Sequence, residues 1–402
     1  MSGGNNLIDL SLRPRLKSGV NYSLIKENLS DTAVIYVGNG VRGLKVRTDS
    51  LTSDISGLPS LQLFLSTLQS LNGHTSLATI SEQIKCSHEF ISKVIEELLR
   101  HQLIDTTSST LKFSNRIIEN FSSNQFDTSG EKSDGAYQSL MARIKPELEI
   151  TTWYENSLDG GVEKVHSRID FPVLIVGLSR IAIATAAILQ ASGFQSIHIA
   201  ARSPEENPDQ TITFEDISGG YIRPSDCGIG KQRVVADMNA QISLFPISKD
   251  YSTTRSIAPS VPRFKPRLIV SIGWPSANSV QEWMSSDTPF IIVDEFINRS
   301  ISVGPLVVPG KSACINCVHL AREERDPFLN HIVELRRLLP PREVPAAVTS
   351  YVAGLISLDA IAFADLGQST FSNVQKIFSL DSLDSPQIFQ WGLHPECQCR
   401  AV

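Results

Sequence analysis

The chain has 402 residues, which is too long for one compact core and indicates two or three domains. Its composition, 41% hydrophobic and 19% charged, is that of an ordinary globular protein, and its net charge of -6 argues against the broad basic surface that nucleic acids and acidic membranes require. Because the sequence shows neither a secretory signal pattern nor an uninterrupted apolar stretch of about 18 residues, we expect a cytoplasmic protein that binds neither nucleic acid nor membrane.

The N-terminal region begins with a predicted β-hairpin. The apolar run TAVIYV at 32–37 indicates a strand, and VRGLKVR at 41–47 indicates the returning strand. Between them, Asn39-Gly40 is typical of a two-residue hairpin turn.

Three helical patterns follow the hairpin. The first spans 60–71, the second is capped by Thr75 or Ser76, and the third is capped by Ser87. The third, SHEFISKVIEELLRHQL, is nearly balanced in charge, whereas a helix that reads the major groove needs cationic and amide side chains on its outer face. A hairpin with three short helices gives a winged-helix outline. We expect it to bind a peptide or protein, although the apolar stripe of the third helix also serves the core of this domain.

A polar stretch at 122–135, SSNQFDTSGEKSDG, has neither helical nor strand periodicity and marks a boundary. We therefore expect three parts. These are a small α+β, winged-helix-like domain at 1–107, a polar linker with a connecting helix at 108–165, and a larger α/β domain at 166–402.

The larger domain begins with a predicted β-α-β unit of the nucleotide-binding type. Its strand, helix and second strand are predicted at 170–177, 178–191 and 196–200. In the first turn, Gly177 and Ala182 fit the glycine-rich fingerprint, but Ser179 stands where the second glycine belongs. That glycine lets phosphate oxygens approach the backbone at the helix N-terminus, so its loss predicts a degenerate nucleotide loop.

The ends of other strands in this domain also lack the expected acidic residues. The second strand runs into Arg202 without an acid for the ribose hydroxyls, although an arginine there could bind the 2′-phosphate of NADP. Gly273-Trp274 stand where an adenylating enzyme needs an acid for its metal-bound ATP. The simplest interpretation is a nucleotide fold without its nucleotide. Two further strands and a helix between them are predicted at 267–273, 289–294 and 279–284.

Four cysteines stand in two tight pairs near the C-terminal end, Cys314 with Cys317 and Cys397 with Cys399. Four thiolates satisfy the tetrahedral preference of Zn²⁺ without an open position, so the pairs predict a closed structural zinc site. Ordinary buried thiols or disulfides are the alternative, and a reducing compartment disfavours disulfides. We expect His394, in HPECQC, to orient the turn rather than to contribute to a catalytic zinc.

Several of these segments resemble a known family. The run VGPLVVPGKSACINCVHLAREERDP from Val303, the HPECQC motif and the Rossmann strand are similar to the ThiF/MoeB-type superfamily of ubiquitin-activating-like proteins. More narrowly, they resemble the cyclodehydratase partner proteins, also called leader-peptide-binding or Ocin-ThiF-like proteins, of thiazole/oxazole-modified (TOMM) ribosomal peptide pathways. RPRLKSG, at Arg13 to Gly19, is similar to the start of the peptide-recognition domain in those proteins.

The resemblance implies a protein that captures the leader of a precursor peptide and presents its core to a YcaO-type cyclodehydratase. The leader would add as a strand to the hairpin edge at 41–47. The residues implied at this site are the hairpin residues Val41, Leu44, Lys45 and Val46 and an apolar wall of Val94, Ile95 and Leu98.

We therefore predict a non-catalytic, peptide-binding partner of a YcaO-type enzyme that contains structural zinc and does not use ATP. The sequence does not decide whether the protein forms a homodimer. The stretch IRPSDCGIGKQR resembles the superfamily's segment near the nucleotide and retains Gly230, Lys231 and Arg233. This retention sustains a first alternative, an ATP-dependent adenylyltransferase that acts on a peptide or carrier-protein carboxylate. An NADP-dependent oxidoreductase that uses Arg202 is the second alternative.

Overall fold

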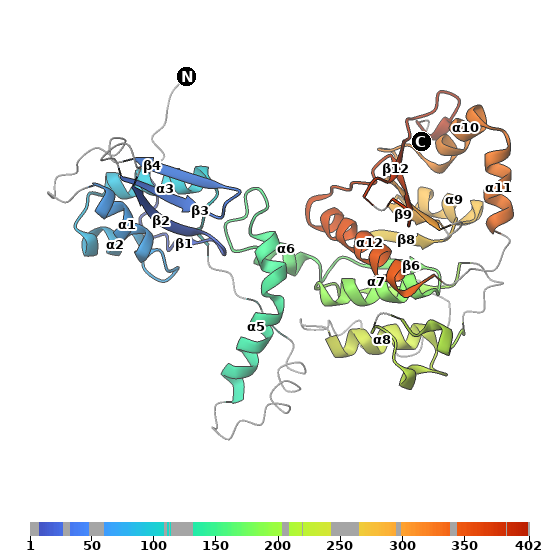
Figure 1. Cartoon of the computed structure of the whole chain (residues 1–402), viewed down its shortest axis with the longest axis horizontal. Helices are drawn as coiled ribbons and strands as arrows, with labels where there is room; N and C mark the ends of the chain where they lie inside the picture. The colour runs from blue at the N-terminus through green and yellow to red at the C-terminus, as the bar shows by residue number, and fades with distance from the viewer. Residues whose placement is uncertain are drawn as a thin grey trace. The chain divides into compact units, whose positions relative to one another are not determined.

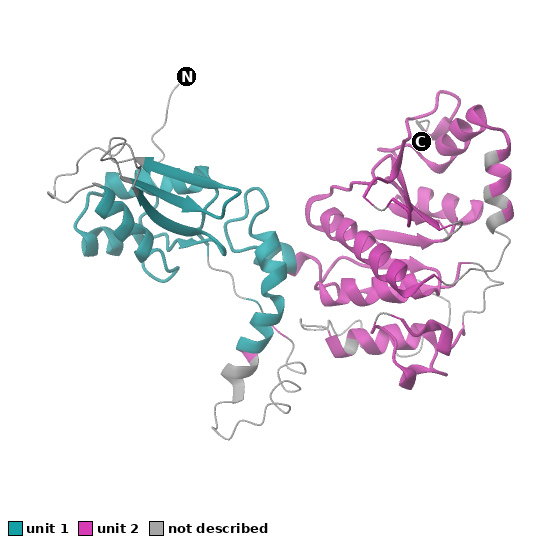
Figure 2. Cartoon of the chain, viewed as in Figure 1, with its two compact units in different colours: residues 1–111, 138–165 teal, residues 112–137, 166–402 magenta. Residues whose placement is uncertain are grey.

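The structure is a computed structural model that divides into two compact units. One unit consists of residues 1–111 and 138–165, and the other of 112–137 and 166–402 (Figure 2). The segment 138–165, expected to connect two domains, thus belongs to the first unit. The structure describes residues 8–26, 33–47, 60–107, 111, 113, 132–202, 209–218, 220–242, 265–294, 299–337, 344–382 and 384–400.

The first unit contains two small antiparallel sheets and several helices (Figure 1). Its strands are β1 (Arg15–Leu16), β2 (Asn21–Lys26), β3 (Ala33–Gly38), β4 (Gly43–Arg47) and β5 (Ile104–Asp105). Its helices are α1 (Ser60–Ser70), α2 (Leu77–Ile84), α3 (His88–Arg100) and α5 (Lys132–Thr151), and α6 (Val162–Ser167) crosses the boundary between the units. The larger sheet has the strand order β2-β3-β4, and β1 pairs with β5.

The hairpin and the caps of two helices agree with the sequence prediction. Ile35 and Val37 of β3 are fully buried, because alternate side chains of a strand share one face. Ser76 accepts a hydrogen bond from the backbone N–H of Thr79, and Ser87 accepts one from that of Phe90. β2 was not predicted, and these observations do not establish the winged-helix outline.

A buried lysine joins β1 to the segment that follows α5. Lys17 is 2% exposed, and its Nζ donates to the carbonyl oxygens of Thr152 at 2.5 Å and Ser157 at 2.7 Å. Asp105, also buried, lies 3.7 Å from Lys17 Nζ and 3.5 Å from Arg15 Nε. Burial lowers the pKa of Lys17 and raises that of Asp105, so each charge depends on these partners. Lys17, in the RPRLKSG segment, thus holds the segment after β1 against the segment after α5.

We expect a fragment of residues 1–107 to be unstable and a fragment of residues 1–165 to fold. The shorter fragment lacks Trp153, which packs against the apolar core of the first unit, so part of that core becomes exposed to solvent. It also lacks the carbonyl oxygens of Thr152 and Ser157, which accept hydrogen bonds from the buried Lys17. Circular dichroism during heating should show a cooperative transition for the longer fragment alone. Equal melting temperatures for the two fragments would contradict this role of the 138–165 segment.

The second unit contains a seven-stranded sheet with the order β12-β11-β10-β9-β8-β6-β7. The strands are β6 (Val173–Val176), β7 (Ile197–Ala200), β8 (Leu268–Ile272), β9 (Phe290–Val293), β10 (Ser300–Val307), β11 (Val374–Ser379) and β12 (Gln387–Gln390). Strands β7, β6, β8 and β9 are parallel, and the remaining three extend the sheet in antiparallel pairs. The helices are α7 (Arg180–Ala191), α8 (Lys231–Ile242), α9 (Ala277–Ser285), α10 (Ile315–Arg325), α11 (Phe328–Arg337) and α12 (Ala346–Leu366).

Helices cover both faces of the parallel strands (Figure 1). Ile175 and Val270 point toward the core shared with α7 and α12, whereas the neighbouring residues Val176 and Ile269 pack with Trp283 of α9. This alternation follows from the two-residue repeat of a strand and explains why the parallel strands are almost wholly apolar. The predicted mixed α/β architecture with a parallel central sheet is therefore confirmed.

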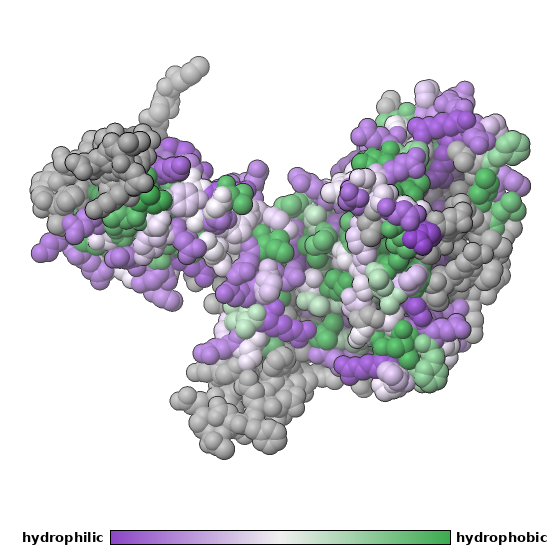
Figure 3. Space-filling view, in the orientation of Figure 1, coloured by the Kyte–Doolittle hydropathy of each residue, from purple (hydrophilic) through white to green (hydrophobic). Residues whose placement is uncertain are grey.

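Helix α12 packs against α7 and carries one half of a buried ion pair. Arg168 Nε and Nη2 donate to the two carboxylate oxygens of Asp365 at 2.9 and 2.7 Å, and its Nη1 donates to the Ser192 carbonyl at 2.8 Å. Both charged side chains are fully buried. Among the described helices, only α12 is long and apolar enough to cross a membrane, a test that core helices also pass. In Figure 3, hydrophobic (green) and hydrophilic (purple) residues are mixed on the visible face of this unit.

Candidate functional site

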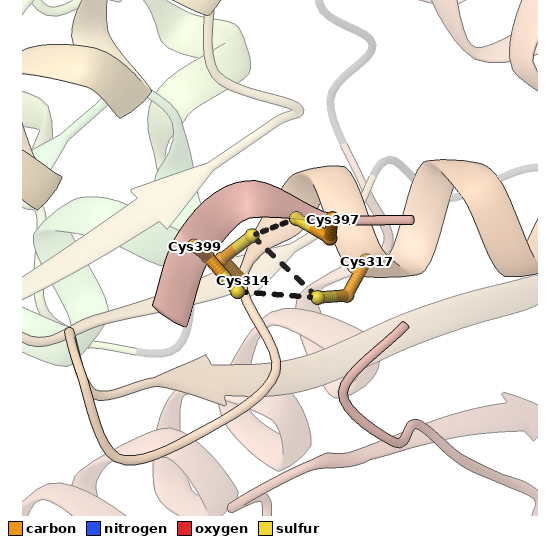
Figure 4. A group of neighbouring side chains, drawn as sticks. All are labelled: Cys314, Cys317, Cys397 and Cys399. Atoms are coloured by element: carbon orange, nitrogen blue, oxygen red, sulfur yellow. Dashed lines mark hydrogen bonds between the residues drawn. The ribbon is translucent and has the colours of Figure 1, made fainter. Parts of the chain in front are cut away.

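The four paired cysteines come together in the second unit (Figure 4). Cys314 is the N-cap of α10 and Cys317 lies in its first turn, whereas Cys397 and Cys399 come from the turn and short 3-10 helix at the end of the chain. The sulfur–sulfur distances are 3.8 Å for Cys314–Cys317, 3.5 Å for Cys314–Cys397 and 3.5 Å for Cys317–Cys399. All four sulfur atoms lie within 4.8 Å of one another.

This cluster fits Zn²⁺ in both geometry and chemistry. Zinc–sulfur bonds of about 2.3 Å place tetrahedral sulfur atoms about 3.8 Å apart, close to the separations observed. His394 is engaged elsewhere, since its Nε2 lies 3.0 Å from Glu324 and its Nδ1 accepts from the Glu396 backbone. The structure thus brings together all four predicted ligands, which could hold a metal ion and tie the C-terminal turn to α10.

The pKa values of three of the four thiols are shifted, and in opposite directions. Burial raises the pKa of Cys314, and it raises that of Cys399 to about 11. At Cys397, burial opposes ionisation, but hydrogen bonds from Asn316 Nδ2 and the Cys399 backbone outweigh it and lower the pKa to about 7. A bound Zn²⁺ would deprotonate the thiols and balance their combined charge.

The second candidate site lies at the carboxyl ends of β6 and β8, where the strand order reverses. In open α/β sheets this is where ligands bind. Gly177 adopts a φ of 125°, and a Cβ there would come within 3.0 Å of the Ile272 carbonyl oxygen. Ser179 is the N-cap of α7 and makes no capping hydrogen bond. Its Cβ stands at the position where the glycine-rich fingerprint has a glycine that lets phosphate approach the backbone. Ala182 is buried in the core. The predicted degenerate loop is therefore positioned as a nucleotide loop would be.

An arginine and a glycine meet at the same strand ends. Gly273 has a φ of 97°, and any Cβ at this position would collide with the guanidinium of Arg202. Arg202 therefore lies across the end of β8, where an adenylating enzyme would need an acidic residue and this chain has Gly273-Trp274. Trp274 is 5% exposed and stacks on His319, so it belongs to the packed interior.

The segment that resembles the superfamily's stretch near the nucleotide contains Gly230, Lys231 and Arg233, and the structure gives each of them contacts. Lys231 is buried, and its Nζ donates to Asp216 Oδ1 at 2.7 Å and to the Leu178 carbonyl at 3.0 Å. It thereby fixes the turn after β6. Arg233 is mostly exposed and lies 3.6 Å from Asp237, while Gly230 precedes α8 and has open space where a Cβ would project. These contacts make Lys231 a residue that positions the loop.

The expected peptide edge is an edge of the β2-β3-β4 sheet. β4 pairs with β3 alone among the described strands, so its other side is an edge. Lys45 is exposed, Leu44 is half-buried and Val46 is buried. Val41 is 92% exposed, but it lies in the turn that precedes β4.

The three α3 residues expected to form an apolar wall are inside the first unit. Val94 is 3% exposed, and Ile95 and Leu98 are fully buried in the same core as Ile35 and Val37. Their side chains therefore support the hairpin from within the core of the first unit.

Sequence reasoning missed Asp216, the partner of Lys231, and Arg322, which lies between two tryptophans. Asp216 stands beside Glu215, and Arg322 stands in the run REER, so each resembles an ordinary surface charge in the sequence. Only their burial, 1% and 8% exposed, distinguishes them from their neighbours.

No family model and no curated protein matches the chain. Among solved structures, E. coli MccB with ATP matches 97% of this chain and 99% of that chain, with a TM-score of 0.58 and 17% identity. The microcin C7 biosynthetic enzyme MccB in complex with N-formylated MccA matches 96% and 99%, with a TM-score of 0.57 and 17% identity. PaaA matches 79% of this chain and 97% of its own, with a TM-score of 0.50 and 15% identity.

These likenesses show the fold of the chain. They support the predicted ThiF/MoeB-type architecture over nearly the whole length, and they do not show a place among the cyclodehydratase partners. The expectation that ATP is not a ligand receives no support, because a protein of this fold was solved with ATP bound. In fold, the chain resembles E. coli MccB over 97% of its length.

Proposed function

We propose that the protein binds a ribosomally made precursor peptide and serves in its modification. The observation that carries this proposal is the likeness, over 96% of the chain, to a microcin C7 biosynthetic enzyme in complex with N-formylated MccA. A second observation supports it, since the first unit presents the edge of a small sheet, the element to which extended peptides add as a strand.

The register of the hairpin identifies which backbone groups a peptide would meet. The Asn39 backbone N–H donates to the Arg42 carbonyl at 3.0 Å, and hydrogen-bonded pairs alternate along an antiparallel ladder. Leu44 and Val46, opposite Val37 and Ile35, therefore bond to β3. The N–H and C=O of Lys45 point to the outer edge, so Lys45 is the central backbone contact that we propose.

Replacing Lys45 by proline should weaken peptide binding about tenfold or more. Proline removes the outward donor and leaves a peptide acceptor without its hydrogen bond, a loss of about 1–3 kcal/mol. Lys45→Ala keeps the amide and should bind nearly as wild type does. Binding is measured by fluorescence anisotropy with labelled peptides translated from the short open reading frames next to this gene.

The opposite edge of the sheet provides a matched control. By the same alternation, the amide of Leu24 in β2 points away from β3, so Leu24→Pro makes an equivalent change at the other edge. We expect this variant to bind normally. Loss of binding in Leu24→Pro with normal binding in Lys45→Pro would place the peptide on β2, and circular dichroism verifies that both variants fold.

ATP-dependent adenylylation of the peptide is a second candidate function for the second unit. The likeness to MccB with ATP favours it over the role of partner to a YcaO-type enzyme. Ser179, which follows β6, and Arg202, which follows β7 and lies across the end of β8, are the features that oppose it. If the Ser179 Cβ obstructs the phosphates, Ser179→Gly should bind Mg-ATP more tightly in calorimetry, and Ser179→Ala, which keeps the Cβ, should not.

Pyrophosphate exchange separates the two roles. Peptide-dependent exchange of labelled pyrophosphate into ATP would establish adenylylation. A protein that binds the peptide but catalyses no exchange would support the partner role, and a YcaO-type cyclodehydratase should then modify the peptide only when this protein is present. Absence of peptide binding would refute both roles, because each requires that this protein bind the precursor peptide.

A further inference from the structure

Arg322 of α10 is buried between the four-cysteine cluster and the strand ends. Its guanidinium lies 4.7 Å from the ring centre of Trp274 and 5.5 Å from that of Trp391. Its Nη2 donates to Gln375 Oε1 at 3.1 Å, and Gln375 in turn donates to Ser302 at 2.6 Å. Cation–π contacts gain strength in such a desolvated setting, so the arginine is held in one place.

The two tryptophans belong to different parts of the unit. Trp391 packs in one cluster with Cys314, Cys317 and Cys397. Trp274 follows Gly273 directly and packs with Val176 and Ile269 of the parallel strands. The guanidinium of Arg322 therefore bridges the packing around the cysteines and the end of β8.

We propose that Arg322 is a positioning residue that couples the metal site to the end of β8. Protein interiors are close-packed and transmit small displacements, and a planar group in contact with two rings moves with both. A change at the four cysteines displaces Trp391, then Arg322 and then Trp274, which adjoins the contact of Gly273 with Arg202. The proposal rests on metal binding by the cysteines and is independent of peptide and ATP binding.

Arg325 supplies a matched comparison on the same helix. Its guanidinium lies 5.2 Å from the ring centre of Trp391 and 5.8 Å from that of Phe389. Arg325 thus contacts the aromatic layer beside the cysteines, whereas Arg322 contacts that layer and Trp274. Arg325 is exposed and Arg322 is buried, and of these two arginines Arg322 is the one that contacts Trp274, as the proposal requires.

Fluorine NMR of the full chain labelled with 5-fluorotryptophan tests the coupling directly. The four resonances, from Trp153, Trp274, Trp283 and Trp391, are assigned by tryptophan-to-phenylalanine variants. Spectra of the Zn²⁺ form are compared with those of the Cd²⁺ form, in which a larger thiolate-binding ion changes the cluster without removing it. We expect the resonances of Trp391 and Trp274 to shift, and that of Trp153, in the other unit, to stay.

The variants then locate the coupling. In Arg322→Lys the Trp391 resonance should still respond to the metal exchange while the response of Trp274 is lost. In Arg325→Lys both responses should remain. A Trp274 resonance that is unchanged in the wild type, or that responds equally in Arg322→Lys, overturns the coupling. A chain that takes up neither ion overturns the metal site and the coupling together, and leaves the peptide proposal untouched.

Discussion

Replacing Asp365 by asparagine is expected to lower the free energy of unfolding by about 3–5 kcal/mol. The change leaves the Arg168 guanidinium buried without its carboxylate, at a site where both side chains are fully buried. The pair joins the segment after α6 to the end of α12, so its loss weakens the packing of α12 on α7. Chemical denaturation followed by circular dichroism measures the difference.

An exposed pair in the same unit provides the control. Arg299 and Asp381 lie 2.9 Å apart with side chains that are 64% and 69% exposed, and such pairs contribute about 0–1 kcal/mol. Asp381→Asn should therefore have little effect. The double variant Arg168→Met/Asp365→Leu should recover part of the loss, because apolar replacement removes the unpaired buried charge. Equal destabilisation by Asp365→Asn and Asp381→Asn would contradict the structural role of the buried pair.

The protein should purify with one zinc ion per chain, and Cys399→Ser or Cys314→Ser should release it. Removal of one thiolate opens a site that four sulfur atoms would otherwise close, and it frees the C-terminal turn from α10. If the loss is about 3–5 kcal/mol, the melting temperature falls by roughly 10 °C, since a unit of this size shifts about 2–4 °C per kcal/mol. Elemental analysis and thermal denaturation measure both effects.

Two cysteines outside the cluster serve as controls for this experiment. Cys86→Ser and Cys227→Ser should keep the zinc, because neither residue belongs to the four-cysteine cluster. Metal-free purified protein in which all four clustered thiols react freely in the folded state would refute the zinc site.

The sequence by itself determined the features that depend on neighbouring residues. A cap bonds a backbone N–H only two or three positions away, so Ser87 was predicted as one helix cap and Thr75 or Ser76 as another, of which the structure shows Ser76. The parallel strands were predicted because strands buried on both faces form short apolar runs. The cysteine pairs were predicted to meet because four thiolates in two closely spaced pairs match the tetrahedral ligand set of Zn²⁺.

Some local signals had more than one structural solution. The apolar stripe of α3 was compatible with a peptide groove and with the domain core, and the burial of Ile95 and Leu98 assigned it to the core. Leu44 and Lys45 lie on one predicted strand, but the pairing register decided which amide points to the open edge. Successive side chains of a strand point to opposite faces of the sheet, so the sequence pattern predicts which residues share a face. It does not predict which backbone amides bond to the neighbouring strand, because that depends on the pairing register.

Only the tertiary structure decided the contacts between distant residues. Lys17 bonds to the carbonyl of Thr152, 135 positions away, and Arg168 to Asp365, 197 positions away. Arg322 has the same sequence surroundings as the exposed residues beside it, yet it stacks between two tryptophans from separate strand ends. The type and local spacing of side chains do not identify the distant group that pairs with a buried charge, because burial depends on how whole helices and strands pack together.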